Sequence, residues 1–313
     1  MTAVMSANAP AAPDLAGSNL ANSNLANKIE RLVSASEKHT YDPFQIIDWD
    51  LPIDDSAYHL PPELLPLHGT PQWEAMSEAE RITYSRHECA SLCAAGIWFE
   101  SILMRFLLDH LYDMPADDQS HRYLLIEAAD ECRHSAMFGE YVRRAGTPSY
   151  RVEPKLRFGG KFLMATSGGA EAYVAVLAAE ELLDAANRLT MRDERVHPTS
   201  AAIAKLHVLE EARHVSYAKA YLTELWPTMS PLAKLAARVR TPFVCFTIAM
   251  ALTNPALYKE LGIEDGYRAA RSNALHRIRI RRDLGKLTGF LTDLGMIGPV
   301  GTFVWSKLGL MEG

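Results

Sequence analysis

The chain has 313 residues, 48% of them hydrophobic, so it can bury a large core as one domain or as one domain with additions. A net charge of −6 provides no general electrostatic attraction to nucleic acid, and we expect no nucleic-acid partner. The cysteines lack the spacing of zinc ligands and stand in apolar helical context, which indicates reduced core thiols in a cytoplasmic protein: Cys89, Cys93, Cys132 and Cys245.

The N-terminal segments are predicted to lie outside the helical core. Residues 1–27 are rich in Ala, Asn, Ser and Pro and predict a flexible tail, followed by a single helical domain over residues 28–313. No apolar run precedes Lys28, and the longest one, residues 243–252, is too short to cross a bilayer. We therefore expect neither a secretory signal nor a membrane partner. Pro and Asp between residues 41 and 72 predict an extended arm over the outside of the helical body.

The first helix of the predicted core begins at Ser77, because Ser77 and Glu80 match a capping box. A loop at residues 113–117 ends this helix and leads to a second one, which ends near residues 146–148. Glu100 on the first helix is predicted to point inward, because its neighbours at helical offsets form an apolar stripe: Cys93, Gly96, Ile97, Leu103, Met104 and Leu107.

A link containing Pro154, Gly159 and Gly160 precedes the third helix, which carries two adjacent acids. Glu180 shares its face with apolar side chains and is the inward one, whereas Glu181 lies on a charged face that we expect to be solvated. The apolar neighbours of Glu180 are Tyr173, Val176, Leu177 and Leu183, and the charged neighbours of Glu181 are Asp184, Arg188 and Arg192.

The fourth helix is predicted over residues 199–226, after a break at His197-Pro198. Further helices, interrupted by Gly and Pro, follow over residues 230–313, and almost nothing is typical of a strand. We therefore predict an all-α fold, a ferritin-like four-helix bundle over about residues 77–227 with additional C-terminal helices.

One pattern occurs on both the second and the fourth predicted helix: an acid, Glu, any residue, Arg and His, at residues 130–134 and 210–214. The Glu and His of each copy are three residues apart, so they share a helix face and can bind one metal ion. Two such pairs and two lone glutamates form the ligand set of a di-iron or di-manganese site. Two divalent ions would also balance four buried carboxylates. The pairs are Glu131 with His134 and Glu211 with His214, and the lone glutamates are Glu100 and Glu180.

His207 offers a third imidazole, because it stands four residues before Glu211 on the same helix face. A hydrogen-bonded core histidine is the alternative interpretation. The equivalent position in the first copy is Glu127, which is open to three interpretations: a further ligand, a proton relay or an acid paired with Arg. Asp130 and Glu210 are expected to accept hydrogen bonds from metal-bound imidazoles, with a surface ion pair as the alternative.

This residue set resembles the AurF-type non-haem di-iron N-oxygenases, which include the p-aminobenzoate N-oxygenase and an arylamine oxygenase of chloramphenicol biosynthesis. The motifs span residues 100–214, or about 80–230 with the flanking helices, and the histidine four residues before the second motif Glu is the most specific mark. The resemblance implies that Glu100 and His134 hold one iron, that Glu180, His207 and His214 hold the other, and that Glu131 and Glu211 bridge them.

The resemblance further implies a homodimer that uses O2 as co-substrate, takes electrons from an external reductant or reductase, and serves antibiotic biosynthesis or other secondary metabolism. It does not transfer p-aminobenzoate, because residues 89–99 contain no Arg or Lys to anchor an aromatic carboxylate. A basic stretch could dock an anionic carrier protein, although such a stretch is more often a solvated helix face: Arg268, Arg271, Arg277, Arg279, Arg281, Arg282 and Lys286.

The sequence therefore predicts a di-iron N-oxygenase that oxidises a primary aryl or alkyl amine to a hydroxylamine, and further to nitroso or nitro products. A C–H hydroxylase or desaturase is the nearest alternative and would need an elongated or aromatic-lined pocket. A ferritin-like iron-binding ferroxidase is another, but it needs a nearly bare bundle, which the additional C-terminal residues do not favour. A radical-generating subunit would need a tyrosine close to the irons, for which Tyr173 and Tyr217 are candidates.

Overall fold

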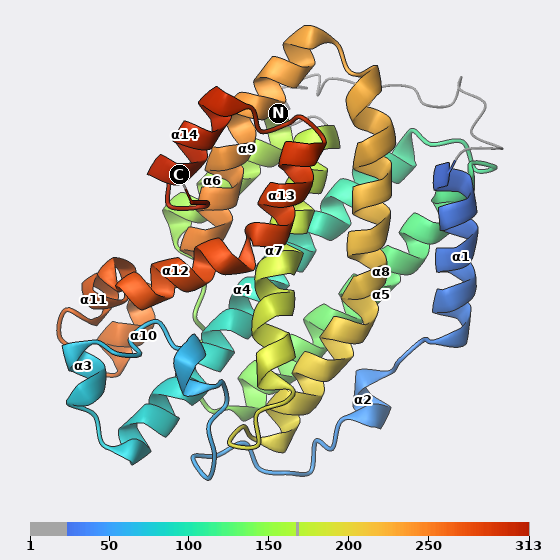
Figure 1. Ribbon diagram of the computed structural model, residues 1–313. Helices are drawn as coiled ribbons and strands as arrows, with labels where there is room; N and C mark the ends of the chain where they lie inside the picture. Colours follow the sequence, from blue (N-terminus) through green and yellow to red (C-terminus); the bar gives the residue numbers. More distant parts are fainter. Residues whose placement is uncertain (1–23, 167–168, 313) are drawn as a thin grey trace, which may run out of the picture.

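The computed structural model describes residues 24–166 and 169–312 of the chain. Its architecture is all-α, as predicted, and outside the helices these residues form one isolated β-bridge, between Tyr58 and Val196. Four long helices form the central bundle, which is visible in Figure 1. The first two pack on each other, as do the last two: α4 (Glu78–Tyr112) with α5 (Gln119–Arg144), and α7 (Gly169–Thr190) with α8 (Pro198–Thr228).

Local sequence signals explain where the bundle helices begin. The capping box predicted for α4 is present, since Ser77 Oγ accepts a hydrogen bond from the Glu80 backbone and the Glu80 carboxylate accepts one from Ser77 N at 2.7 Å. Helix α8 begins at Pro198, directly after His197, whose ring accepts a hydrogen bond from the Thr199 backbone at 3.2 Å. These caps fix the ends of the helices that carry the inward acids and histidines.

The N-terminal tail prediction is partly wrong, because residues 24–27 already belong to α1 (Asn24–Lys38). Leu25, Ile29 and Leu32 form a stripe at helical spacing and are buried against the bundle, where α1 packs on α5 and α8. The remainder of the predicted tail, residues 1–23, lies outside the described part of the chain.

The predicted arm is irregular, with short helical turns, but it does not simply cover the outside of the bundle. Trp49, Leu65 and Leu67 are buried in a second hydrophobic core, in which Tyr84 of α4 and Tyr141 of α5 also lie. Burial of these apolar side chains is what holds a segment with few regular hydrogen bonds in place. Its helical turns are α2 (Pro43–Ile46), η3 (Pro62–Leu64) and α3 (Pro71–Glu74).

The link predicted around Pro154, Gly159 and Gly160 is instead a helix, α6 (Pro154–Thr166), which packs on α4 and α9. The C-terminal helices follow the predicted breaks, and three of them pack on α7, namely α9, α12 and α13 (Figure 1). They are α9 (Pro231–Ala251), α10 (Pro255–Glu260), α11 (Gly266–Ser272), α12 (Ala274–Asp283), α13 (Gly285–Asp293) and α14 (Pro299–Lys307).

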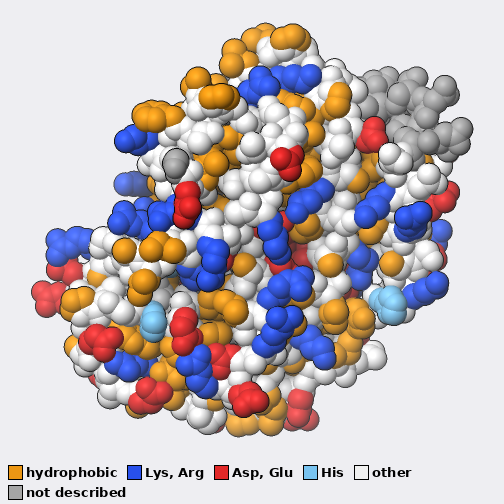
Figure 2. Space-filling model, viewed as in Figure 1, with side chains coloured by type: hydrophobic (Ala, Val, Ile, Leu, Met, Phe, Trp, Pro, Cys, Tyr) orange, Lys and Arg blue, Asp and Glu red, His pale blue; other side chains and the backbone are white. Residues whose placement is uncertain are grey.

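The structure gives the exposure of the cysteines and of one arginine in the basic stretch. Cys132 is exposed, whereas the other three cysteines are buried free thiols, so the core-thiol interpretation is wrong for this residue. Within the basic stretch, the Arg279 side chain is only 16% exposed and faces Asp283. Figure 2 shows Lys and Arg side chains over several elements, with acidic and apolar groups among them. Docking of a carrier protein on this stretch stays a prediction.

Two segments are long and apolar enough to cross a membrane by length and composition alone, Glu78–Tyr112 and Pro231–Glu260. The first is α4, a central helix of the bundle, and its apolar residues Phe99, Leu103 and Leu107 are buried in the protein core. Core packing therefore accounts for the composition of this helix.

Candidate metal centre

The four bundle helices bring all seven predicted ligands into one buried cluster. Each ligand side chain sits mid-helix on the face turned to the bundle axis, and each residue is at most 2% exposed. Helix α4 supplies Glu100, α5 supplies Glu131 and His134, α7 supplies Glu180, and α8 supplies His207, Glu211 and His214.

The glutamates of the two repeated motifs lie between the two motif imidazoles. His134 Nδ1 is 3.1 Å from Glu131 Oε2 and 3.0 Å from Glu211 Oε1. His214 Nδ1 is 2.9 Å from Glu131 Oε1 and 2.9 Å from Glu211 Oε2. Each carboxylate therefore presents one oxygen to each histidine, which is the arrangement that a carboxylate bridging two metal ions requires.

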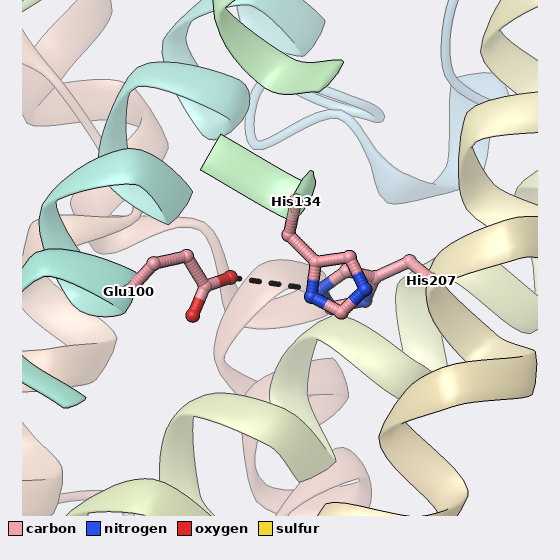
Figure 3. A group of neighbouring side chains, drawn as sticks. All are labelled: Glu100, His134 and His207. Atoms are coloured by element: carbon pink, nitrogen blue, oxygen red, sulfur yellow. Dashed lines mark ion pairs between the residues drawn. The ribbon is translucent and has the colours of Figure 1, made fainter. Parts of the chain in front are cut away.

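The remaining predicted ligands, Glu100, Glu180 and His207, face the same space as the four motif residues. His207 Nε2 lies 3.7 Å from Glu100 Oε1 and 3.6 Å from Glu211 Oε1, and Figure 3 shows Glu100 directed toward the rings of His134 and His207. Ligand atoms of Glu180, His207 and Glu211 lie within 4.8 Å of one another, as do those of Glu100, His134 and His207. His207 thus stands between Glu100 and Glu180, rather than on the side of Glu180 alone.

The donor set fits bound cations. Both oxygens of Glu100, Oε2 of Glu180 and Nε2 of His207 are buried and have no hydrogen-bond partner among the described residues. Burial raises the pKa of Glu100 and of Glu180 well above the ordinary carboxyl value, and neighbouring carboxylates raise both further. A divalent cation would satisfy these atoms and offset the repulsion, and carboxylate with imidazole suits iron or manganese.

Outer acids orient the motif histidines, and they do so across the bundle. Asp130 of α5 lies 3.2 Å from His214 Nε2 of α8, while Glu210 of α8 lies 2.9 Å from His134 Nε2 of α5. Both acids are almost fully buried, so they do not form a surface ion pair. Arg213 contacts both of them, at 3.2 Å and 3.6 Å, and Arg133 also pairs with Asp130, so two cations face the two acids. A histidine that donates through Nε2 presents Nδ1 to a metal.

Glu127 completes a group at the α5 end of the cluster. Its ligand atom lies within 4.8 Å of those of Glu131 and His214. Burial raises the pKa of Glu127 to about 8. Its position is compatible with a further ligand or with a proton-carrying group beside the centre. Tyr173 and Tyr217, with ring centroids 6.1 Å apart, are buried in the adjoining core.

Two residues near the centre differ from the sequence-based expectation. Asn187 was not predicted, yet its amide nitrogen lies 3.1 Å from His207 Nδ1. Its position seven residues after Glu180, on the same face of α7, was the available signal. Glu181 is 4% exposed and pairs with Lys219 at 2.6 Å, so the solvated interpretation is wrong because α8 covers that face.

A cavity of about 120 Å³ adjoins the cluster, with Glu100 and Glu180 in its wall. It lies between α4 and α7, with α6 and α9 contributing one residue and three residues to its lining. Aromatic side chains from α4 line it, namely Trp98, Phe99 and Phe106. An organic molecule in this space would therefore lie directly beside the candidate metal ligands.

The family model described as "P-aminobenzoate N-oxygenase AurF" matches residues 22–295 of the chain, which includes every element of the bundle. The chain belongs to this AurF family. Its members are di-iron enzymes with N-oxygenase-like activity, and the present cluster offers acidic and histidine groups that can hold metal.

Curated relatives include uncharacterized proteins of Mycobacterium bovis and of two strains of Mycobacterium tuberculosis. Each is 29% identical over 247 residues, which covers 75% of this chain and 73% of the relative. The AurF family membership therefore supports a di-iron oxygenase in general, and the particular reaction is argued below.

Proposed function

We propose that this AurF-family protein is an O2-dependent di-iron N-oxygenase that converts a primary amine to a hydroxylamine, and further to nitroso or nitro products. The observation that supports this most directly is the third imidazole: His207 is fully buried and its Nε2 faces Glu100 and Glu211. A four-helix di-iron site of the usual type is built from four Glu and two His, one His from each Glu-x-x-His pair. The additional neutral donor is the feature that the sequence shares with the N-oxygenases.

The irons, when bound, would supply the activation of O2 with electrons from an external reductant. The chain's own residues hold and orient the site. Glu131 and Glu211 would hold both irons, and Asp130 and Glu210, which lie within hydrogen-bond distance of the two motif histidines, would fix the tautomers of those histidines. The aromatic and aliphatic part of the cavity wall would reduce contact between a bound amine and water.

A C–H hydroxylase is a second candidate, because the cavity is lined by aromatic side chains, as such an enzyme would need. The ferritin-like alternative receives less support, since the helices from α9 to α14 cover one side of the bundle that an iron-storing shell would leave bare. Buried Tyr173 and Tyr217 keep a radical-generating role as a lesser alternative.

The decisive experiment is aerobic incubation of the reduced, iron-loaded protein with aryl and alkyl amines under ¹⁸O2, with products read by mass spectrometry. We expect about two irons per chain, because four carboxylates need about four positive charges. We also expect the product to carry ¹⁸O bound to the nitrogen of the amine. In Glu211→Ala, loss of a bridging carboxylate should remove both irons and the activity. A metal content of one zinc per chain, or ¹⁸O bound to carbon only, would overturn the proposal.

We further propose a homodimer in the cytoplasm that receives electrons from a separate reductase. These assignments rest on family resemblance and on the reduced cysteines, and size-exclusion chromatography with light scattering tests the first of them. A carrier-bound amine is an additional hypothesis. The competition of free and carrier-linked amines for turnover would test it.

A further inference from the structure

Three neighbouring helices form a positively charged side of the molecule, which we term the α6–α9–α14 face. Helix α9 packs on both α6 and α14 (Figure 1). The three helices contain no Asp or Glu, whereas three Lys or Arg residues lie in α6, three in α9 and one in α14. The chain as a whole has a net charge of −6, so this face concentrates positive charge on an acidic protein. The cations are Lys155, Arg157, Lys161, Lys234, Arg238, Arg240 and Lys307.

Acidic side chains neutralise little of this charge. Among the described residues, Arg240 pairs with Glu171 at 3.6 Å, and the other six cations form no ion pair with a carboxylate. The acids next to these helices in sequence are Glu153, which precedes α6, and Glu312, which follows α14. Five of the six side chains are exposed and Lys234 is partly exposed, so they can approach an anionic surface.

Large apolar side chains stand on the same three helices. On α9 they recur at three- and four-residue spacing, opposite the buried stripe of Ala237, Thr241 and Cys245, and they are Leu232, Leu235, Val239 and Phe243. Helix α6 adds Phe158, and α14 adds Val300 and Phe303. These side chains are between 53% and 82% exposed, and Figure 2 shows apolar and basic groups adjoining over α9 and α14. Apolar side chains gathered in this way on adjacent helices mark an interaction surface.

The charge of the face decides between its candidate occupants. A two-fold dimer would bring the same patch of two copies together, so like charges would meet, and the centres of protein interfaces are depleted in Lys. An anionic lipid surface matches both properties of the face. Lys and Arg reach lipid phosphates while apolar side chains enter the boundary of the acyl chains. Side chains this exposed can enter a fluid phase, which needs no matching shape, whereas an acidic protein would need one.

We infer that the α6–α9–α14 face docks the protein on the surface of an anionic lipid bilayer. Helix α9 does not cross the bilayer, because its opposite side is buried against α7. The sequence-based expectation of no membrane partner considered spanning segments, and this face lies across three separate helices. The cytoplasmic leaflet carries anionic lipid, so docking is compatible with the proposed location. Helices α6 and α9 also contribute Gly160 and Val244 to the cavity wall, although docking does not depend on the proposed reaction.

The test is flotation of the full-length, iron-loaded protein with vesicles of phosphatidylcholine alone or of phosphatidylcholine with phosphatidylglycerol. We expect at least tenfold tighter binding to the anionic vesicles. Binding should weaken as salt is added, because salt screens exposed charges. Equal binding to both kinds of vesicle, or no binding to either at low salt, would overturn the inference. This comparison requires no variant.

Two double variants separate the contributions of charge and of apolar surface. Lys155→Glu with Lys161→Glu reverses two charges on α6, and Val239→Ser with Phe303→Ser removes apolar groups from α9 and α14. Each should weaken binding to the anionic vesicles at least tenfold. All four side chains are exposed, so circular dichroism should show unchanged helix content. Wild-type binding in both double variants would overturn the assignment of this face.

The matched control lies on α8, where Lys205 and Leu209 are exposed one helical turn apart. Lys205→Glu with Leu209→Ser should leave vesicle binding unchanged, and an equal loss there would show that the attraction is not confined to the α6–α9–α14 face. Light scattering without lipid tests the other occupants. A stable dimer that Val239→Ser with Phe303→Ser dissociates would assign the face to a second copy, and saturable binding of an acidic carrier protein in place of vesicles would assign it to a protein. Either result would overturn membrane docking.

Discussion

The histidine on which the N-oxygenase assignment depends is positioned by a residue from another helix. His207 Nε2 faces the ligand cluster, and its Nδ1 lies 3.1 Å from the Asn187 side-chain amide. The amide nitrogen of Asn187 is the atom that faces Nδ1, and both would be donors if a metal took the lone pair of Nε2 and left the proton on Nδ1. With metal bound, the amide would therefore be turned by 180° so that its oxygen accepts from Nδ1. Asn187 is therefore a positioning residue for His207.

Replacing Asn187 with Leu should remove this acceptor while keeping the side-chain volume similar. We expect iron affinity or amine turnover to fall 10- to 100-fold, as is typical when the partner of a metal-bound histidine is lost. Iron titration followed by turnover measures both. Asn187→Asp, which still accepts the Nδ1 proton, should retain most of the affinity. Wild-type affinity and turnover in Asn187→Leu would show that the contact has no role at the centre.

A second residue-level prediction concerns Glu88, a buried acid of α4 away from the metal centre. The hydroxyls of Tyr84 and Tyr258 donate hydrogen bonds to it at 2.7 Å and 2.9 Å, but burial outweighs them and raises the pKa of Glu88 to about 7. Its ordinary value is 4.5, so the folded state holds the proton more tightly than the unfolded state.

The contribution of Glu88 to stability is fully present below pH 4.5, is lost as the pH rises toward 7, and is constant above that. The total change is at most roughly 3 kcal/mol. Glu88→Gln stays neutral, so the unfolding free energy of the wild type, minus that of the variant, should fall as the pH rises over this range. Denaturant unfolding of both proteins at pH 5 and pH 8 measures it. A difference that does not vary with pH would contradict the assignment.

At the scale of elements, two adjacent glycines of α6 provide a matched pair. A Cβ on Gly160 would come within 2.8 Å of the Trp98 ring, whereas a Cβ on Gly159 would meet no atom within 4 Å. We expect Gly160→Ala to destabilise the protein by roughly 1–3 kcal/mol through overpacking. Gly159→Ala should stabilise it by roughly 0.5–1 kcal/mol, because alanine favours a helix. Thermal unfolding of the two variants tests both signs. Equal changes in melting temperature would contradict the close contact between residue 160 and Trp98.

These glycines also show where sequence patterns stop being informative. The pair was interpreted as a link because glycine usually weakens a helix, but contact between Gly160 and Trp98 depends on a helix distant in sequence. Asn187 escaped notice for the same reason, since its partner His207 lies on α8. Helix periodicity and caps are local, which is why the bundle, its breaks and the inward direction of Glu100 could be predicted.

At the scale of the whole molecule, the buried carboxylates make stability depend on metal. A ligand present at about 1,000 times its dissociation constant stabilises the native state by about 4 kcal/mol, which for a chain of 313 residues corresponds to a melting-temperature rise of roughly 6 °C. Chelation of the iron-loaded protein should lower the melting temperature by about that amount. Glu211→Ala, which is expected to hold no iron pair, should show no response to the chelator. Iron removal without a change in melting temperature would contradict the charge-balance argument.

The crossed contacts between α5 and α8 have a consequence for synthesis. When α4 and α5 leave the ribosome, they carry Glu100, Glu131 and His134, but the acid that orients His134 is Glu210, on a helix not yet made. The first half of the chain therefore lacks the second bridging carboxylate and a correctly oriented imidazole. We therefore expect that an iron pair could bind only after α8 completes the bundle, so that a nascent, open chain would not hold iron that reacts with O2.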